Sequence, residues 1–204
     1  MRKKRYAGML AAVFFVLLPA VLASGCGKSE NGQETTGLRI EKNGGVTSCI
    51  VESFDKTYYS LEGLEAMIRE EIAAYDPSGS GAVTLQSAEV PEEETGKVIV
   101  TMKYASVEDY AKFNETVLFY GTVAQAQEAG YKFDEKLVSV SDKTKTLAGT
   151  DLTAMADSPV LITGEALQVM LPAKVIYISD GAELVNSKCV NAVNTDGLTY
   201  VIMK

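Results

Sequence analysis

The 204-residue chain contains no histidine and no tryptophan, and it has only five prolines and three cysteines. Without histidine it lacks the commonest general base and the commonest transition-metal ligand. We therefore expect no metal site, no cofactor and no catalytic cysteine activated by an imidazole. The absence of tryptophan disfavours a strong aromatic platform for carbohydrate. Three cysteines are too few for a disulfide scaffold.

Basic residues are also scarce, with 19 Lys and Arg against 27 Asp and Glu and a net charge of −8. This balance argues against a phosphate-backbone partner, so we expect no nucleic acid to be bound. Hydrophobic residues make up 47% of the chain, which is typical of a globular protein and excludes disorder. We expect the body of the protein to act as a monomer.

The N-terminal segment has the pattern of an export signal. Four basic residues at positions 2–5 precede an uncharged run that is strongly apolar over residues 10–18. The segment ends in Leu-Ala-Ser-Gly-Cys at residues 22–26, which resembles the lipobox of bacterial lipoproteins. The resemblance implies that residues 1–25 are removed as a signal peptide and that the Cys26 thiol receives a diacylglycerol. It also implies a protein anchored in the cell membrane that faces the extracytoplasmic side.

The alternative is an uncleaved membrane helix followed by an ordinary cysteine. The apolar run is near the lower limit for a spanning helix and is interrupted by Pro19, which favours the lipoprotein. Loss of residues 1–25 removes four positive charges and no negative ones, so the net charge of −8 becomes −12. An acidic body is not attracted to an anionic bilayer, so the lipid must supply the attachment.

The remaining chain divides into three stretches. Residues 26–37 contain no apolar residue after Cys26 and predict a flexible tether. Residues 38–141 predict an α+β domain. Residues 142–204 predict a linker, or an irregular cover, followed by a small antiparallel β unit that packs on the domain.

Hydrophobic periodicity predicts the elements of the domain. From residue 46 to residue 141 the expected order is strand, helix, strand, strand, helix, strand, which is that of a ferredoxin-like split βαβ fold. The first helix is expected after Ser60, with an apolar stripe that begins at Leu61 and ends at Tyr75. Capping-box patterns at Ser106 and Thr122 predict two shorter helices.

Two groups of residues invite a chemical interpretation. Cys49 and Cys189 are the thiols that remain beside Cys26, and outside the cytoplasm they can form a disulfide. The alternative is two separate buried thiols in strands. Tyr58, Tyr59 and Tyr120 are candidates to line a ligand groove, because a tyrosine ring supplies contact area and its hydroxyl supplies direction. The competing interpretation is that the aromatic residues of this region serve core packing.

Other motifs are less informative. The consecutive acids Glu92, Glu93 and Glu94 lack the alternating spacing of a calcium loop and fit a solvated turn. Residues 58–76, 100–114 and 119–123 are similar to parts of uncharacterised lipoproteins of Gram-positive gut bacteria. That resemblance implies a location but no assigned activity.

The function that we expect is non-catalytic binding of a small ligand, a wall component or an envelope partner by a membrane-anchored extracytoplasmic lipoprotein. The tether lets the domain search near the membrane. One alternative is a structural factor that docks another envelope protein. A carboxylate-only hydrolase is a third interpretation, because a pair of Asp or Glu side chains in a cleft cannot be recognised from sequence.

Overall fold

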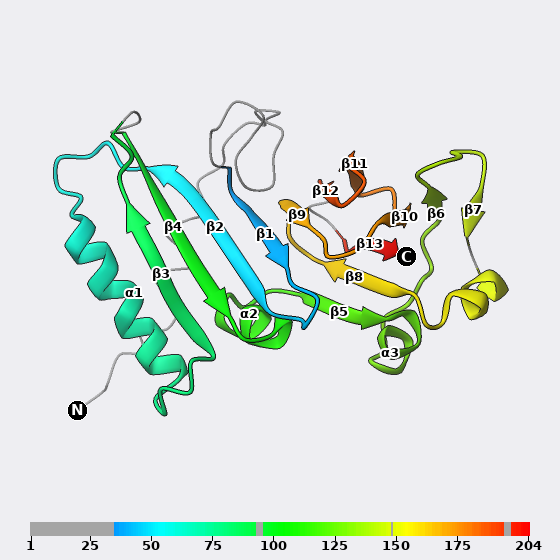
Figure 1. The fold of residues 1–204 in the computed structure, drawn as a ribbon, viewed down its shortest axis with the longest axis horizontal. Helices are drawn as coiled ribbons and strands as arrows, with labels where there is room; N and C mark the ends of the chain where they lie inside the picture. Colours follow the sequence, from blue (N-terminus) through cyan, green and yellow to red (C-terminus); the bar gives the residue numbers. More distant parts are fainter. Residues whose placement is uncertain (1–34, 93–95, 148, 194–196) are drawn as a thin grey trace.

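The structure is a computed structural model that describes residues 35–92, 96–147, 149–193 and 197–204. Within these residues the strands form two sheets, which we call sheet A and sheet B (Figure 1). The expected signal peptide, Cys26 and the tether up to residue 34 lie outside the described residues, as do Glu93 and Glu94.

Sheet A extends from β3 at the left of Figure 1 to β12 and β11 right of its centre. Its strands run in the order β11 (Ala182–Asn186), β12 (Cys189–Ala192), β9 (Gln168–Met170), β1 (Gly37–Ile40), β2 (Val46–Ser53), β4 (Lys97–Tyr104) and β3 (Val83–Glu89). All neighbours are antiparallel except β1 and β9, which are parallel. A Cβ atom on Gly37 would lie 2.8 Å from the Gln168 carbonyl oxygen, so the close approach of β1 and β9 requires glycine there.

Sheet B lies at the right of Figure 1 and is antiparallel throughout. Its strands run in the order β5 (Leu118–Thr122), β8 (Pro159–Thr163), β13 (Thr199–Met203), β10 (Val175–Ile178), β6 (Leu137–Ser139) and β7 (Thr146–Leu147). Strand β8 has a cluster on each face, because Leu161 joins the larger hydrophobic cluster while Val160 and Ile162 join the smaller one. The two sheets therefore share a continuous interior.

Each α-helix begins where the sequence predicts a cap. Helix α1 (Leu61–Tyr75) starts after Ser60, whose hydroxyl accepts from the Gly63 amide at 3.2 Å. Helix α2 (Val107–Phe113) starts after Ser106 in the same way. Helix α3 (Val123–Glu128) has a full capping box made by Thr122 and Gln125. A short 3-10 helix, η1 (Gly149–Met155), follows β7.

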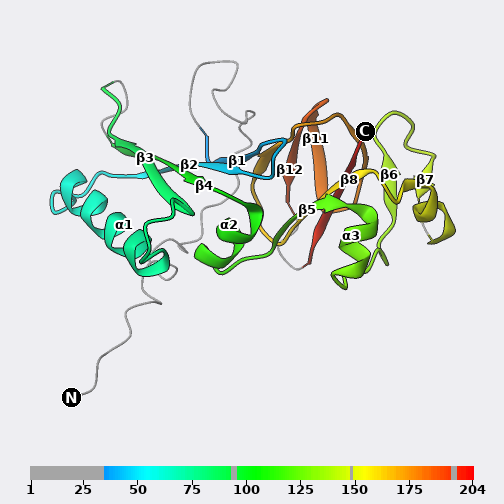
Figure 2. The same ribbon diagram turned by 60° about the horizontal axis from the view of Figure 1, so that its bottom comes forward.

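The helices give sheet A two unlike faces. The buried residues of α1 and α2 belong to the same hydrophobic cluster as Leu38 and Ile40 of β1; they are Ile68, Val107 and Tyr110. Figure 2 shows α1 and α2 on this side of the sheet. No helix of the described residues covers the opposite side, which we call the outer face. Alternation along each strand places every second side chain there.

The chain is thus a mixed α+β protein with mainly antiparallel sheets, as predicted, but the ferredoxin-like arrangement is not confirmed. Strands β2, β4 and β3 and helix α1 do form a split βαβ unit, since β4 pairs with both β2 and β3. The expected fourth strand, near residues 137–141, does not join them. It pairs instead with β10 and β7 in sheet B, and β1 occupies the position beside β2.

The sheets do not follow the expected boundary between residues 141 and 142. Strands from both sides of that position lie in sheet A and in sheet B. Residues 142–159 form a turn, β7 and η1, and their Leu147 and Leu152 are buried in the smaller cluster. This stretch therefore covers sheet B rather than linking two separate units. Burial of its apolar side chains against that sheet is favourable, because it removes them from water.

Candidate functional site

A hollow of about 720 Å³ lies at one end of sheet A, where three chain reversals meet. The β1–β2 turn contributes Lys42 and Asn43, the segment after β9 contributes Pro172, and the β11–β12 turn contributes Lys188. Arg39 reaches the hollow from the outer face of β1. Turns separated by more than a hundred residues in sequence therefore build one concave surface.

Local turn chemistry shapes the rim of this hollow. The Asn43 side chain accepts a hydrogen bond from the Gly45 amide at 3.1 Å, and Gly44 adopts a positive φ of 84° that favours glycine. The Asn186 side chain accepts from the Lys188 amide at 2.9 Å in the opposite turn. Lys188 Nζ donates to the Pro172 carbonyl at 3.4 Å, which directs its ammonium group along the rim.

The hollow is cationic although the chain is acidic. Its lining includes the three exposed bases Arg39, Lys42 and Lys188 and the single acid Glu41. Within the described residues, none of these three bases takes part in an ion pair. Three positive side chains that line one hollow with a single acidic residue leave a net positive charge there. Such a site attracts an anion such as a phosphate or a carboxylate. We call these residues and the space between them the cationic hollow.

A second hollow, of about 670 Å³, lies between the end of α1 and β3. Asp76 lines it, but its carboxylate is occupied by local hydrogen bonds. One oxygen accepts from the Ser78 hydroxyl at 2.8 Å, and the other accepts from the Ser80 hydroxyl and from the Gly81 and Ala82 amides. These donors hold the pKa of Asp76 well below its usual range. The residue closes a loop and is poorly suited to exchange protons.

The structure separates the tyrosines that were candidates for one groove. Tyr58 and Tyr59 lie in the connection between β2 and α1, where the Tyr59 ring stacks on Phe54 with centroids 5.1 Å apart. Tyr58 is 77% exposed. Tyr120 lies on β5 of sheet B and packs against the larger hydrophobic cluster. None of the three lines either hollow, so the tyrosine groove stays a prediction.

The order of strands in sheet A corrects the predicted cysteine pairing. Cys49 lies on β2 and Cys189 on β12, and strands β1 and β9 separate them. Three steps of about 4.8 Å between neighbouring strands place the two residues at least about 14 Å apart. A disulfide needs Cα atoms within about 7 Å. The predicted Cys49–Cys189 bridge is therefore incompatible with this sheet order.

A partly buried polar cluster that no sequence pattern predicts links α2 to the turn between β8 and β9. The Tyr110 hydroxyl donates to Glu165 at 3.0 Å, across 55 residues of sequence. The rings of Tyr104 and Tyr110 meet edge to face with centroids 4.9 Å apart. Burial raises the pKa of Glu165 and of Tyr110. No periodic pattern marks Glu165, because it lies in the turn between β8 and β9 and meets Tyr110 only in the folded chain.

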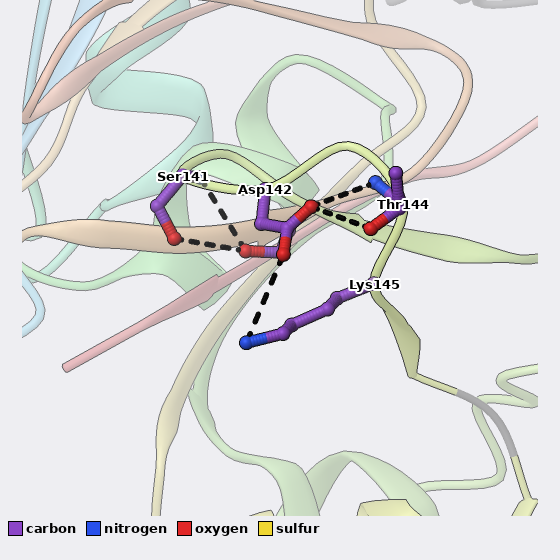
Figure 3. A network of polar contacts seen from close by, with 5 residues as sticks. Ser141, Asp142, Thr144 and Lys145 are labelled. Atoms are coloured by element: carbon purple, nitrogen blue, oxygen red, sulfur yellow. Dashed lines mark hydrogen bonds and ion pairs between the residues drawn. The ribbon is translucent and has the colours of Figure 1, made fainter.

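A polar turn at Asp142 connects β6 to β7 (Figure 3). One oxygen of Asp142 accepts from the amide and the hydroxyl of Thr144 at 3.1 and 2.6 Å, and the other lies 3.8 Å from Lys145 Nζ. The hydroxyls of Ser139 and Ser141 are 3.1 Å apart. Hydrogen bonds from Thr144 lower the pKa of Asp142. Every group is used in shaping the turn, so we assign it a structural role.

Neither hollow combines two carboxylates, and the described residues hold no metal-binding cluster. Each hollow is lined by one carboxylate, Asp76 in one and Glu41 in the other, whereas a carboxylate-only hydrolase needs a pair. Among the described residues no group of three or more Cys, Asp or Glu side chains is arranged to hold a metal ion. No helix in the described ranges is long and apolar enough to cross a bilayer.

Comparison with protein families, with curated proteins and with solved structures finds no match to this chain.

Proposed function

We propose that this protein is a lipid-anchored, extracytoplasmic binding protein that holds an anionic ligand in the cationic hollow. The observation that carries the binding part is the convergence of Arg39, Lys42 and Lys188 on one concave surface of a chain with a net charge of −8. Cations scattered over such a chain would be neutralised by neighbouring acids. The grouping of these three basic residues at one hollow supports recognition of an anionic ligand.

The anchoring part rests on the leader and Cys26. Two acyl chains on that cysteine suffice for stable attachment, whereas one chain is marginal. The stretch of about ten residues that follows extends to at most about 35 Å, which lets the domain reach ligands near the membrane without leaving it. Such a tether raises the local concentration of the hollow at the outer surface of the membrane.

Docking of an envelope protein is the second candidate function, and one observation favours it. Phe54, Tyr58 and Tyr59 form an aromatic group on the β2–α1 connection, and the Tyr58 ring meets that of Tyr59 edge to face at 5.0 Å. Aromatic side chains with high exposure are enriched at protein interfaces. We rank this below anion binding, because three side chains make a small contact area.

We also propose a relation between the split βαβ unit and the ferredoxin-like fold. The strands β2, β4 and β3 with the crossing helix α1 correspond to one half of that fold. In this interpretation the second half is replaced by β1 and the strands from the C-terminal part of the chain. No activity follows from the relation.

Binding is tested with tripolyphosphate as the probe, by calorimetry on the full chain in nonionic detergent. We expect saturable binding that Arg39→Gln and Lys188→Gln weaken. The matched variants Lys132→Gln and Lys136→Gln remove exposed lysines from the segment after α3, away from the hollow, and should bind as the wild type does. Absence of saturable binding, or equal losses in all four variants, contradicts the assignment of the cationic hollow.

Anchoring is tested by Cys26→Ala in the host. The change removes the sulfur that would carry the lipid, so we expect the protein to move from the membrane fraction to the soluble fraction. Cys49→Ala, which alters a thiol on β2, serves as the control and should remain with the membrane. Retention of Cys26→Ala in the membrane fraction contradicts lipidation at this residue.

A further inference from the structure

The outer face of sheet A carries a row of residues that begins at β3 and ends beside the cationic hollow. The pairing register places the members of this row directly opposite one another across six strands. They are, in order, Thr84, Lys103, Thr47, Arg39, Met170 and the buried Cys189. Lys188 adjoins the last of them and lines the hollow.

Burial shows that the basic side chains of this row face away from the core. Lys103 is exposed between the buried Met102 and Tyr104, and Arg39 is exposed between the buried Leu38 and Ile40. Two strand spacings separate Lys103 from Arg39, which corresponds to about 10 Å. Arg39 lines the cationic hollow while Lys103 lies outside it. The positive charge therefore continues beyond the hollow along the sheet.

The row is too long for a small ligand. Four strand spacings lie between β4 and β12, so Lys103 and the position next to Lys188 are roughly 20 Å apart. A single phosphate or carboxylate can contact the hollow but cannot reach Lys103 at the same time. An extended polyanion can contact Lys103, Arg39 and Lys188 together. Charge complementarity over this length thus selects a chain of negative groups.

The residues between the cations indicate what kind of polyanion fits. Thr47 separates Lys103 from Arg39, and Thr84 lies on the far side of Lys103. Threonine hydroxyls can bond to phosphate or polyol oxygens, whereas the row has no aromatic ring on which a nucleobase could stack. The acids that the register puts on this face, Glu89 and Glu183, lie on the two edge strands in other rows.

We propose that the outer face of sheet A binds a linear polyanion of repeated phosphate or phosphodiester groups along the row formed by Lys103, Arg39 and Lys188. This rests on the proposed function, because it extends the anion site of the cationic hollow and names the class of its ligand. A soluble polymer that lies across the sheet is the occupant. Recognition is through charge and hydroxyl groups and is independent of any base.

The experiment compares long-chain linear polyphosphate with tripolyphosphate on the full chain in nonionic detergent. Long chains should bind more tightly at equal phosphate concentration. Three neutralised phosphates predict an affinity that falls about 30-fold between 50 and 200 mM salt. Lys103→Gln should lower the salt slope by about 0.7–0.9 and weaken long-chain binding several-fold. The same change should leave tripolyphosphate binding unaltered, because Lys103 lies outside the hollow.

Matched variants keep the result interpretable. Lys112→Gln removes an exposed lysine from α2, which covers the other side of sheet A, and should retain wild-type affinity for both probes. Lys103→Arg should restore long-chain binding, because it preserves the charge. Circular dichroism of each variant establishes that the fold is retained, and these positions are exposed, so little destabilisation is expected.

Each outcome separates the two proposals. If Lys103→Gln leaves long-chain binding unchanged while Arg39→Gln weakens both probes, the row is overturned and the cationic hollow stands. If neither probe binds, both proposals fail. A further experiment measures sedimentation of the Cys26→Ala variant, which lacks the lipid-bearing sulfur, with vesicles of phosphatidylglycerol and phosphatidylcholine. Sedimentation with these vesicles that depends on Arg39 and Lys103, without polyphosphate binding, overturns the polymer in favour of a lipid surface.

Discussion

Glu165 has a raised pKa that could not be predicted from its neighbours in the sequence. Its carboxylate, in the turn between β8 and β9, accepts from the Tyr110 hydroxyl of α2, and burial raises its pKa above the ordinary value of 4.5. A raised pKa means that the folded protein binds this proton more tightly than the unfolded chain does. The stabilising contribution of the group is therefore complete below about pH 4.5 and is lost as the pH rises through the folded pKa.

This linkage predicts the pH dependence of the variant Glu165→Gln. Glutamine imitates the protonated side chain and can still accept from Tyr110, so the variant should not incur the cost of a buried charge. We expect its free energy of unfolding to equal that of the wild type near pH 4 and to exceed it near pH 8. Urea denaturation followed by circular dichroism at both pH values measures the difference.

A control accounts for the general effect of charge. Glu128→Gln also removes one negative charge, but from an exposed position on α3. The comparison of the two variants isolates the contribution of burial. A Glu165→Gln protein that is less stable than the wild type at high pH would show that the charged hydrogen bond outweighs desolvation at this position.

At the scale of elements, caps decide where the helices begin. Thr122 ends β5 and caps α3, and its hydroxyl accepts from the Gln125 amide at 3.2 Å while the Gln125 side chain accepts from the Thr122 amide at 2.9 Å. This reciprocal pair satisfies two donors that a helix end leaves open. The strand and the helix are thereby joined without an intervening loop.

Loss of this cap should destabilise the protein. Thr122→Ala removes the acceptor for the Gln125 amide, and we expect the free energy of unfolding to fall by about 1 kcal/mol. Thr122→Ser keeps the hydroxyl and should stay close to the wild type. Chemical denaturation of the two variants side by side provides the measurement, and equal losses in both would mean that the threonine methyl group, not the cap, is responsible.

Elements were also the level at which prediction from sequence was most successful. The stripe from Leu61 to Tyr75 and the caps at Ser60, Ser106 and Thr122 mark the helices close to their observed bounds. These features are local, because a cap or an amphipathic turn involves residues within a few positions of one another. Strand β6 was also found, but its neighbours were not.

At the scale of the whole molecule, both sheets share one interior. The larger hydrophobic cluster contains Leu38 and Tyr104 of sheet A together with Leu161 and Val201 of sheet B. The other faces of β8 and β13 carry Ile162 and Tyr200 in the smaller cluster. A chain whose central strands belong to both clusters cannot lose one sheet and keep the other.

This arrangement predicts a single cooperative unfolding transition. Leu161 is fully buried, so Leu161→Ala should lower the free energy of unfolding by about 2–5 kcal/mol. Near-ultraviolet circular dichroism reports tyrosine packing, and far-ultraviolet circular dichroism reports secondary structure. In each protein, wild type or variant, the two signals should give the same urea midpoint. Two separated transitions would indicate that residues 38–141 and 142–204 unfold independently.

The amino-acid sequence by itself determined the caps of the helices, the turns and an α+β composition, and it predicts an export leader. Each of these depends on a few neighbouring residues or on a simple periodicity. The tertiary structure decided which strands became neighbours. It paired β1 with β9 across 131 residues, kept Cys49 apart from Cys189 and sent β6 into sheet B.

The candidate site belongs to that second category. Arg39, Lys42 and Lys188 are unremarkable basic residues in a strand and two turns, and they form a cationic hollow only because β9 and β12 align beside β1. Strand pairing is selected by the sum of buried side-chain contacts over the whole fold, and no local pattern encodes that sum. The sequence specified the individual helices, strands and turns, and tertiary packing decided which charged side chains lie close together.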